Sequence, residues 1–249
     1  YIETILMASK TEIDYINRML DECLSEDGLT CVLTAKYIAD QGLQALLECE
    51  RVYGVENLYL NQNRLSWRSV QPFCESENFK SLKRLYISEN IASDKGAKAI
   101  ANASFASQLV HLDLKYNDMG PDGGLAIARS DKFKKLQILI LQENDTGDEV
   151  LIALSENPNF SNLRKLNVYK TKLSDKGVKA LGKSKYLKKI KHLNLARNII
   201  RLDSALALAN TKTLTKIETL LMYDTFIGDP GIEALVQSKR LKLKTLRLT

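Results

Sequence analysis

The residues best suited to acid–base chemistry are His111, Asp113 and Lys115, which stand at alternate positions of one short segment. Alternate residues of a β-strand point to the same side, so these three side chains would share one surface. An imidazole next to a carboxylate and an ammonium group can accept and release protons. A mixed polar binding surface explains the same residues, and we expect that role rather than catalysis.

The sequence contains none of the motifs that usually carry phosphate or hydrolytic chemistry. It has no G-x-x-x-x-G-K-[ST] loop, no G-x-S-x-G elbow and no H-E-x-x-H helix. Its only histidines, His111 and His192, are far apart in the chain. We therefore expect no metal, no cofactor and no enzymatic activity.

Tyrosine and isoleucine residues give similar segments an apolar character. Ile138 and Ile140 flank Leu139, so in a strand they would point to the side opposite to that leucine and into water. Exposed apolar residues beside tyrosines and charges are typical of protein-binding hot spots, although strand propensity alone also favours tyrosine and isoleucine. The candidate partner-binding residues are Tyr59, Arg84, Tyr86, His111, Asp113, Lys115, Tyr116, Ile138, Ile140, Lys165, Tyr169, His192, Arg197, Leu221 and Tyr223.

An internal repeat of 27 residues must position these side chains. One leucine recurs at positions 58, 85, 112, 139, 166, 193 and 220, within a unit that reads L-x-x-L-x-L-x-x-N. The alternating apolar residues predict a strand, and the asparagine is expected to hydrogen-bond the turn that leaves it. An alanine column at 99, 126, 153 and 180 marks the second half of the unit. Small and apolar residues there predict a helix, which Ser93 or Asp94 would cap in its own repeat.

Stacking of such units predicts a solenoid, because one strand and one helix cannot bury their apolar faces alone. Neighbouring strands lie about 4.8 Å apart and neighbouring helices about 10 Å apart, so the stack must curve with its strands inside. The predicted fold class is α/β: a right-handed horseshoe with a parallel β-sheet on its concave face and α-helices on its convex face. His111 and His192 would lie three strands, or roughly 14 Å, apart, which is too far to share one metal ion.

The repeat is similar to that of leucine-rich repeat proteins, in particular the ribonuclease-inhibitor-like subclass with long helices. The phrase D-x-G-x-x-A-L-x-x-S at residues 175–184 resembles 27-residue repeats of large bacterial proteins. Some proteins with such repeats are effectors that are translocated into a host cell. The resemblance implies a protein-binding solenoid and a bacterial effector that acts in a host cell.

We expect one leucine-rich repeat domain over residues 1–249, with about nine repeats and a final strand. The repeats would start near residues 2, 28, 55, 82, 109, 136, 163, 190, 217 and 243. Residues 2–7 mirror residues 217–222, and an amphipathic helix is predicted at 11–24. Polar caps and an initiator methionine are missing from the sequence, so we expect a fragment of a longer protein.

Cysteine usage and hydropathy indicate the compartment. The four cysteines form no C-x-x-C pair, and Cys31 takes a core leucine position, which predicts reduced thiols in the cytoplasm. No run of 18 apolar residues is present, so we expect no transmembrane segment, and we expect a monomer.

The most direct interpretation is a non-catalytic module that binds a protein partner on its concave face. The net charge of +6 is unevenly divided, because residues 163–249 carry 20 Lys and Arg against 6 Asp and Glu. An alternative is therefore binding of nucleic acid or an anionic surface through this basic C-terminal third. Stacking aromatics are not interleaved with these lysines, which argues against nucleic acid. A further alternative is the substrate-recognition arm of a larger enzyme such as a ubiquitin ligase.

Overall fold

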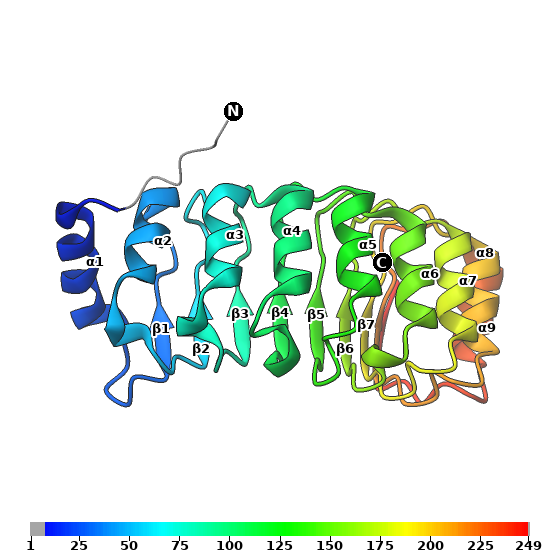
Figure 1. The fold of residues 1–249 in the computed structure, drawn as a ribbon. Coiled ribbons are helices and arrows are strands. Elements are labelled where there is room, and N and C mark those ends of the chain that lie inside the picture. The colour runs from blue at the N-terminus through cyan, green and yellow to red at the C-terminus, as the bar shows by residue number, and fades with distance from the viewer. Residues whose placement is uncertain (1–7, 249) are drawn as a thin grey trace.

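The computed structural model describes residues 8–248, in which short strands alternate with helices (Figure 1). The described strands form one parallel sheet, and each lies beside its neighbours in the sequence. They are β1 (Thr30–Val32), β2 (Asn57–Tyr59), β3 (Arg84–Tyr86), β4 (His111–Asp113), β5 (Ile138–Ile140), β6 (Lys165–Asn167), β7 (His192–Asn194), β8 (Thr219–Leu221) and β9 (Thr245–Arg247). The strand expected near residue 2 lies outside the described residues.

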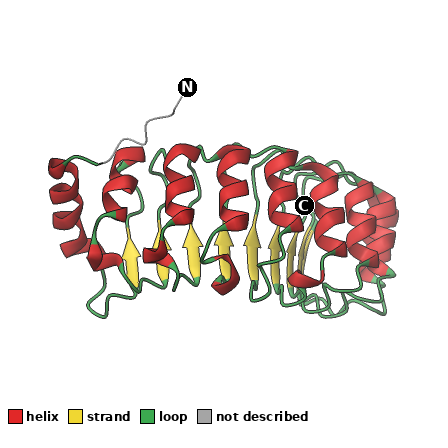
Figure 2. Ribbon diagram, in the orientation of Figure 1, coloured by secondary structure: helices red, strands yellow, loops and turns green. Residues whose placement is uncertain are grey.

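A row of helices covers the outer side of the sheet. They are α1 (Lys10–Cys23), α2 (Ala39–Leu47), α3 (Trp67–Glu75), α4 (Ser93–Asn102), α5 (Pro121–Arg129), α6 (Gly147–Glu156), α7 (Asp175–Lys183), α8 (Leu202–Ala209) and α9 (Gly228–Val236). The row of strands and the row of helices bend together, with the strands on the inner side of the arc (Figure 2). The predicted α/β horseshoe is confirmed, with the sheet on its concave face.

The strands pair so that equivalent residues of successive repeats lie side by side. Leu85 pairs with Leu58 on one side and with Leu112 on the other. These central residues are buried, and the two residues that flank each of them are more exposed, as the alternating pattern predicts. The last step is one residue shorter, since Leu220 pairs with Leu246.

Large aromatic side chains fill the space between helices and strands. The ring of Phe73 lies 4.9 Å from that of Phe79 and 5.1 Å from that of Phe105, measured between centroids. Phe133 and Phe160 contact each other at 5.9 Å, and all of these rings are fully buried. A buried phenylalanine contributes a large apolar area, so each repeat is held to the next by its core.

A ladder of buried asparagines closes the turn after most strands, as predicted. The Nδ2 of Asn144 donates to the carbonyls of Leu114 and Leu141, both at 2.9 Å. Its Oδ1 accepts from the backbone N–H groups of Asn117 at 3.1 Å and Met119 at 3.0 Å. Equivalent buried positions are Asn63, Asn90, Asn117 and Asn198. Most of these bonds connect two repeats, so the ladder fixes the spacing of the turns.

The prediction that Ser93 or Asp94 caps its own helix is wrong. The N-cap of α4 is Ala92, which makes no side-chain hydrogen bond, whereas Oδ1 of Asp94 accepts from Gly120 N–H and Gly123 N–H, both at 2.8 Å. These two groups lie at the start of α5, so the carboxylate caps the helix of the following repeat. The same bond to the next repeat is made by Asp40, Asp148 and Asp175. A Cβ at position 123 would lie 2.5 Å from the Asp94 carboxylate, which explains the glycine there.

Candidate protein-binding site

The concave face is built from the first and third residues of each strand. Ile138 and Ile140 lie on either side of the buried Leu139 and point away from the core, as predicted. Both are half-buried, and so is Leu221. The expectation that they stand in water is therefore wrong in degree, because strands about 4.8 Å apart let neighbouring side chains cover part of each one.

An aromatic stack crosses three consecutive strands at the N-terminal half of this face. The rings of Tyr59 and Tyr86 lie 4.2 Å apart and are nearly parallel, with an interplanar angle of 5°. The Tyr86 ring also contacts His111, at 4.3 Å between centroids, and its hydroxyl lies 3.3 Å from Nδ1 of that histidine. Because the three residues come from β2, β3 and β4, the sheet itself sets their spacing.

The environment of His111 keeps its imidazole neutral. Burial, together with the cations of Lys165 and Arg84, lowers the pKa of His111 to about 4. Its Nε2 is buried and has no hydrogen-bond partner among residues 8–248. Burial also raises the pKa of Asp113, whose Oδ1 accepts from the Lys115 backbone N–H at 3.0 Å. His111 therefore contributes an aromatic surface rather than a charge to the centre of the face.

Charged side chains follow the turns that leave the strands, along one rim of the concave face. Ion pairs join successive turns, namely Lys115 with Glu89 (3.0 Å), Lys170 with Glu143 (2.6 Å) and Arg197 with Asp224 (2.9 Å). Tyr116 occupies an equivalent turn position, with a φ of +51°, and is 44% exposed. The rim therefore contains both matched charges and an accessible aromatic ring.

A second aromatic cluster lies on the C-terminal half of the face. The rings of Tyr169 and Tyr223 lie 6.1 Å apart, and the Arg197 guanidinium is 5.7 Å from the Tyr169 ring centroid. The Arg247 guanidinium lies 4.9 Å from the centroid of Tyr223. Cations stacked on tyrosine rings are common at protein interfaces.

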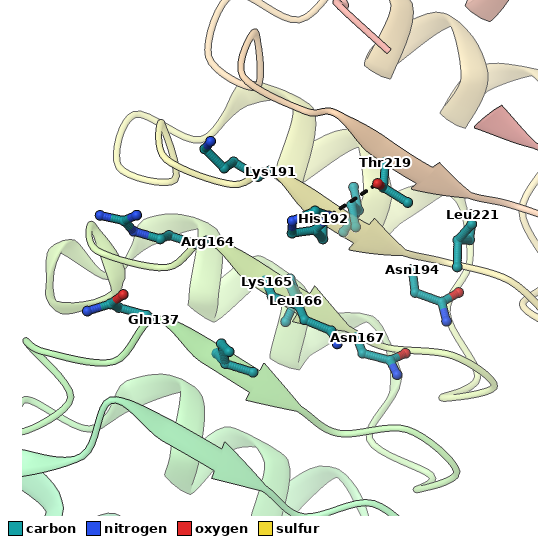
Figure 3. Close-up of a pocket in the computed structure, with 12 residues that line it drawn as sticks. Gln137, Arg164, Lys165, Leu166, Asn167, Lys191, His192, Asn194, Thr219 and Leu221 are labelled. Atoms are coloured by element: carbon teal, nitrogen blue, oxygen red, sulfur yellow. Dashed lines mark hydrogen bonds between the residues drawn. The ribbon is translucent and has the colours of Figure 1, made fainter. Parts of the chain in front are cut away.

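A groove of about 620 Å³ crosses β5 to β8 (Figure 3). Its apolar lining residues are Ile138 and Leu221 on the concave face and the buried Leu166 and Leu193, and the amides of Asn167 and Asn194 lie on the strands between Ile138 and Leu221. Its basic residues are Arg164, Lys165, Lys191 and His192, while none of the described residues that line it carries a carboxylate. The groove therefore combines apolar and amide contacts with a local positive charge.

The prediction included four of the groove residues, which are Ile138, Lys165, His192 and Leu221, and among the basic residues it missed Arg164 and Lys191. These two residues directly precede β6 and β7 at equivalent positions of adjacent repeats. Figure 3 shows their side chains at the same edge of the groove. The repeat itself contains this signal, because a basic column before the strands must lie beside the first column of the sheet.

The two histidines share one column, but the structure does not bring them together. The register runs from His111 through Ile138 and Lys165 to His192, three strands away. The Nδ1 of His192 lies 3.1 Å from the hydroxyl of Thr219. Over the described part of the chain, no group of three or more acidic, histidine or cysteine side chains could hold a metal ion.

The thiols and the helices add two observations about the surroundings of the site. All four cysteines are buried and free, and burial raises the pKa of the Cys31 thiol to about 12. Between residues 8 and 248, no helix combines the length and the apolar character that crossing a bilayer requires.

Comparison with known proteins relates these repeats to a family. The family model described as Leucine Rich repeat matches residues 107–128 and 161–182. No curated protein matches the chain.

Three solved receptor structures are similar to the chain. The LRR ectodomain of the plant membrane receptor kinase GASSHO1/SCHENGEN3 from Arabidopsis thaliana, in complex with CASPARIAN STRIP INTEGRITY FACTOR 2, is 15% identical with a TM-score of 0.47. The match covers 81% of this chain and 22% of that one. The plant peptide hormone receptor RGFR1 in complex with RGF2 is 17% identical with a TM-score of 0.45, over 79% and 32% of the two chains. A TDR receptor is 16% identical with a TM-score of 0.42, over 81% and 32%.

The chain thus spans 22% to 32% of the length of these solved structures. Its own strands and helices repeat in step with the leucine columns over the whole described sheet. Two stretches of the chain thus match the Leucine Rich repeat model, and the same strand–helix unit recurs along the whole described sheet.

Proposed function

We propose that the chain is a non-catalytic module that binds a protein partner on its concave face. The observation that carries this proposal is the groove across β5 to β8, in which apolar side chains lie beside basic ones without a carboxylate among the described lining residues. Half-buried apolar and aromatic residues with a charged rim are the usual composition of an interaction hot spot.

The partner should present acidic and apolar side chains together. Lys165 and Arg164 make no ion pair with another described residue, so both can be neutralised by a ligand. Lys191 differs, because it already pairs with Glu218 at 2.8 Å. A carboxylate that reaches Lys165 and Arg164 would place neighbouring apolar groups over Ile138.

Rigidity makes this surface suitable for binding. The asparagine ladder and the bonds between successive repeats fix the strands before any partner arrives. A site that is ordered in advance loses little conformational entropy on association. A standard interface buries roughly 800 Å² on each partner, an area that about six repeats of concave surface can provide.

The test is a double substitution, Ile138→Asp with Ile140→Asp, in affinity capture from lysate followed by calorimetry with the purified partner. We expect a loss of affinity of about 2 kcal/mol or more, because two carboxylates would enter a contact surface that favours apolar and acidic ligand groups. The matched control is Ile91→Asp with Ile199→Asp, at residues that are 57% and 55% exposed in the strand-to-helix turns.

Circular dichroism should show that both variants keep the fold, because the substituted side chains point away from the core. An equal loss of affinity in the control, or full affinity in the concave variant, would place the partner elsewhere. Unfolding of the concave variant would instead show that Ile138 and Ile140 belong to the core.

Finer features of this proposal rest on the repeat sequence and the thiols. The D-x-G motif at 175–184 supports the ribonuclease-inhibitor-like subclass, with 27-residue bacterial-type repeats, and a bacterial effector that acts in a host cell. Four buried, free cysteines support a reducing, cytoplasmic compartment. We also propose that residues 1–249 form a single repeat domain, and a role as the substrate-recognition arm of an enzyme such as a ubiquitin ligase is the alternative.

A further inference from the structure

Three consecutive loops between a helix and the following strand form a strongly basic edge in the C-terminal third. The loops join α7 to β7, α8 to β8 and α9 to β9. We call their exposed cations the lysine edge, which consists of Lys185, Lys188, Lys189, Lys212, Lys216, Lys239, Arg240 and Lys242. Residues 184–190, 210–217 and 237–243 contain no Asp or Glu. The positive charge of this edge is therefore not balanced within the loops.

The lysine edge also lacks acidic partners from neighbouring elements. None of its cations makes an ion pair with another described residue. Lys191 and Lys244, which lie closer to the strands, instead share Glu218, and these two cations lower the pKa of that carboxyl to about 2. The negative charge of Glu218 is thus already balanced by Lys191 and Lys244, so it does not offset the charge of the loops.

The edge has a defined beginning. The preceding loop, which joins α6 to β6, contains only uncharged residues from 157 to 162. One contact crosses this boundary, since Nζ of Lys189 donates to Oδ1 of Asn162 at 2.7 Å. The lysine edge thus starts at one repeat and continues through three, and an uncharged loop separates it from the mixed charges of residues 131–135.

The position of these loops matters for what can reach them. Strands start at the lower edge of the arc in Figure 1, so all helix-to-strand loops lie along that edge. The concave face and the row of helices stand roughly upright from it (Figures 1 and 2). A flat anionic body could therefore contact the lysine edge while the concave groove stays open to a protein.

We propose that the lysine edge docks the protein on an anionic lipid bilayer. Several cations on parallel loops match a planar array of headgroups, to which each contributes separately. Apolar contacts could add to this, since Val236 at the end of α9 is 66% exposed and Tyr186 in the first loop is 37% exposed. Tyr186 is the only aromatic residue in the three loops, which offers little stacking surface for a single-stranded nucleic acid.

The experiment is sedimentation of the full chain with phosphatidylcholine vesicles that contain either no phosphatidylserine or about 30 mol% of it, at about 100 mM salt. We expect binding only to the anionic vesicles. The variant Lys185→Gln with Lys188→Gln and Lys189→Gln should bind on the order of a hundredfold more weakly, since each lysine near an anionic membrane contributes about fivefold.

A matched control removes the same charge elsewhere, with Lys10→Gln, Lys95→Gln and Lys98→Gln, all exposed and located on α1 and α4 rather than in helix-to-strand loops. This control should bind vesicles nearly as well as the parent. The variant Ile138→Asp with Ile140→Asp should also bind vesicles like the parent, so that failure of the proposed protein site and failure of bilayer binding can be distinguished. Equal weakening by the two lysine triplets would mean that net charge rather than the edge drives binding. Binding of a single-stranded oligonucleotide without binding of anionic vesicles would assign the edge to nucleic acid, and either result would overturn the proposal.

Discussion

The hydroxyl of Tyr86 lies 3.3 Å from Nδ1 of His111, across two adjacent strands of the sheet. This contact extends the stack of Tyr59 on Tyr86 by a third ring and leaves Nε2 of His111 buried without a partner among the described residues. The N-terminal half of the concave face thus contains an aromatic platform of three rings, and its contributions to binding and to stability can be measured separately.

Removal of the Tyr86 ring should weaken partner binding. Tyr86→Ala deletes a stack at 4.2 Å, and we expect a loss of about 1–3 kcal/mol in affinity, measured by calorimetry with the captured partner. Tyr86→Phe keeps both ring contacts and removes only the hydroxyl, which lies 3.3 Å from Nδ1 of His111, so its loss should be smaller. If both substitutions cost the same, the hydroxyl rather than the ring contacts the partner.

His111 should make the stability of the fold depend on pH. Its folded pKa of about 4 lies below the ordinary value of 6.5, so between these values the unfolded chain binds a proton that the folded chain does not. The free energy of unfolding is therefore not reduced by His111 above pH 6.5, and it decreases as the pH falls from 6.5 toward 4. Urea unfolding should therefore show a steeper decrease in the free energy of unfolding for the parent than for His111→Gln. The same substitution at the exposed His192 serves as the control, and parallel curves for the parent and His111→Gln would contradict the prediction.

Breaking the asparagine ladder should destabilise the array. Asn144→Ala removes an amide that donates to two carbonyls and accepts from two backbone N–H groups in a buried turn. This substitution should lower the free energy of unfolding by about 2–4 kcal/mol. Asn144→Thr should cost less, because Thr171 shows how threonine closes such a turn, with its hydroxyl donating to Val168 at 2.9 Å. Denaturant melts of the three proteins provide the measurement, and equal stability of the alanine variant and the parent would exclude a structural role of the ladder.

Removal of a capping aspartate should destabilise the helix of the following repeat rather than its own helix. Asp148 belongs to α6, but its Oδ1 accepts from Ser174 N–H at 2.8 Å and Gly177 N–H at 3.0 Å, at the start of α7. Asp148→Ala should lower stability by about 1–2 kcal/mol and speed amide exchange at these two groups. The control is Glu149→Ala, which removes only an exposed ion pair with Lys176. Faster exchange at the start of α6 instead of α7 would show that Asp148 caps its own helix.

The leucine columns were sufficient to predict the strands, their register and the order of the sheet. A strand with a period of two and a repeat of constant length allow only one way to bury Leu58, Leu85 and Leu112 together. The contact of Tyr59 with Tyr86 could be predicted for the same reason, because the two occupy one column, whereas His111 lies in the other column, opposite Arg84. The role of these residues in binding stays a prediction.

Contacts between repeats were less accessible to sequence reasoning. A local cap is the usual arrangement, so the sequence predicts that Ser93 or Asp94 caps its own helix, whereas Asp94 reaches the next repeat. The basic groove was only half predicted, since Arg164 and Lys191 lie outside the strands whose faces the pattern describes. The distances between side chains of neighbouring turns decide which cations remain unpaired. The sequence gives the type of residue at each position of the repeat but not these distances.

The caps and ladder bonds that cross from one repeat to the next also determine how the protein responds to force. Each repeat is held on both sides by bonds to its neighbours, so a pull on the two ends should release the outermost repeats first, one after another. Each release frees 27 residues, which extends the chain by roughly 90 Å. Under tension, the array should lengthen in nearly equal steps and shorten again when the load is removed, in the manner of a molecular spring.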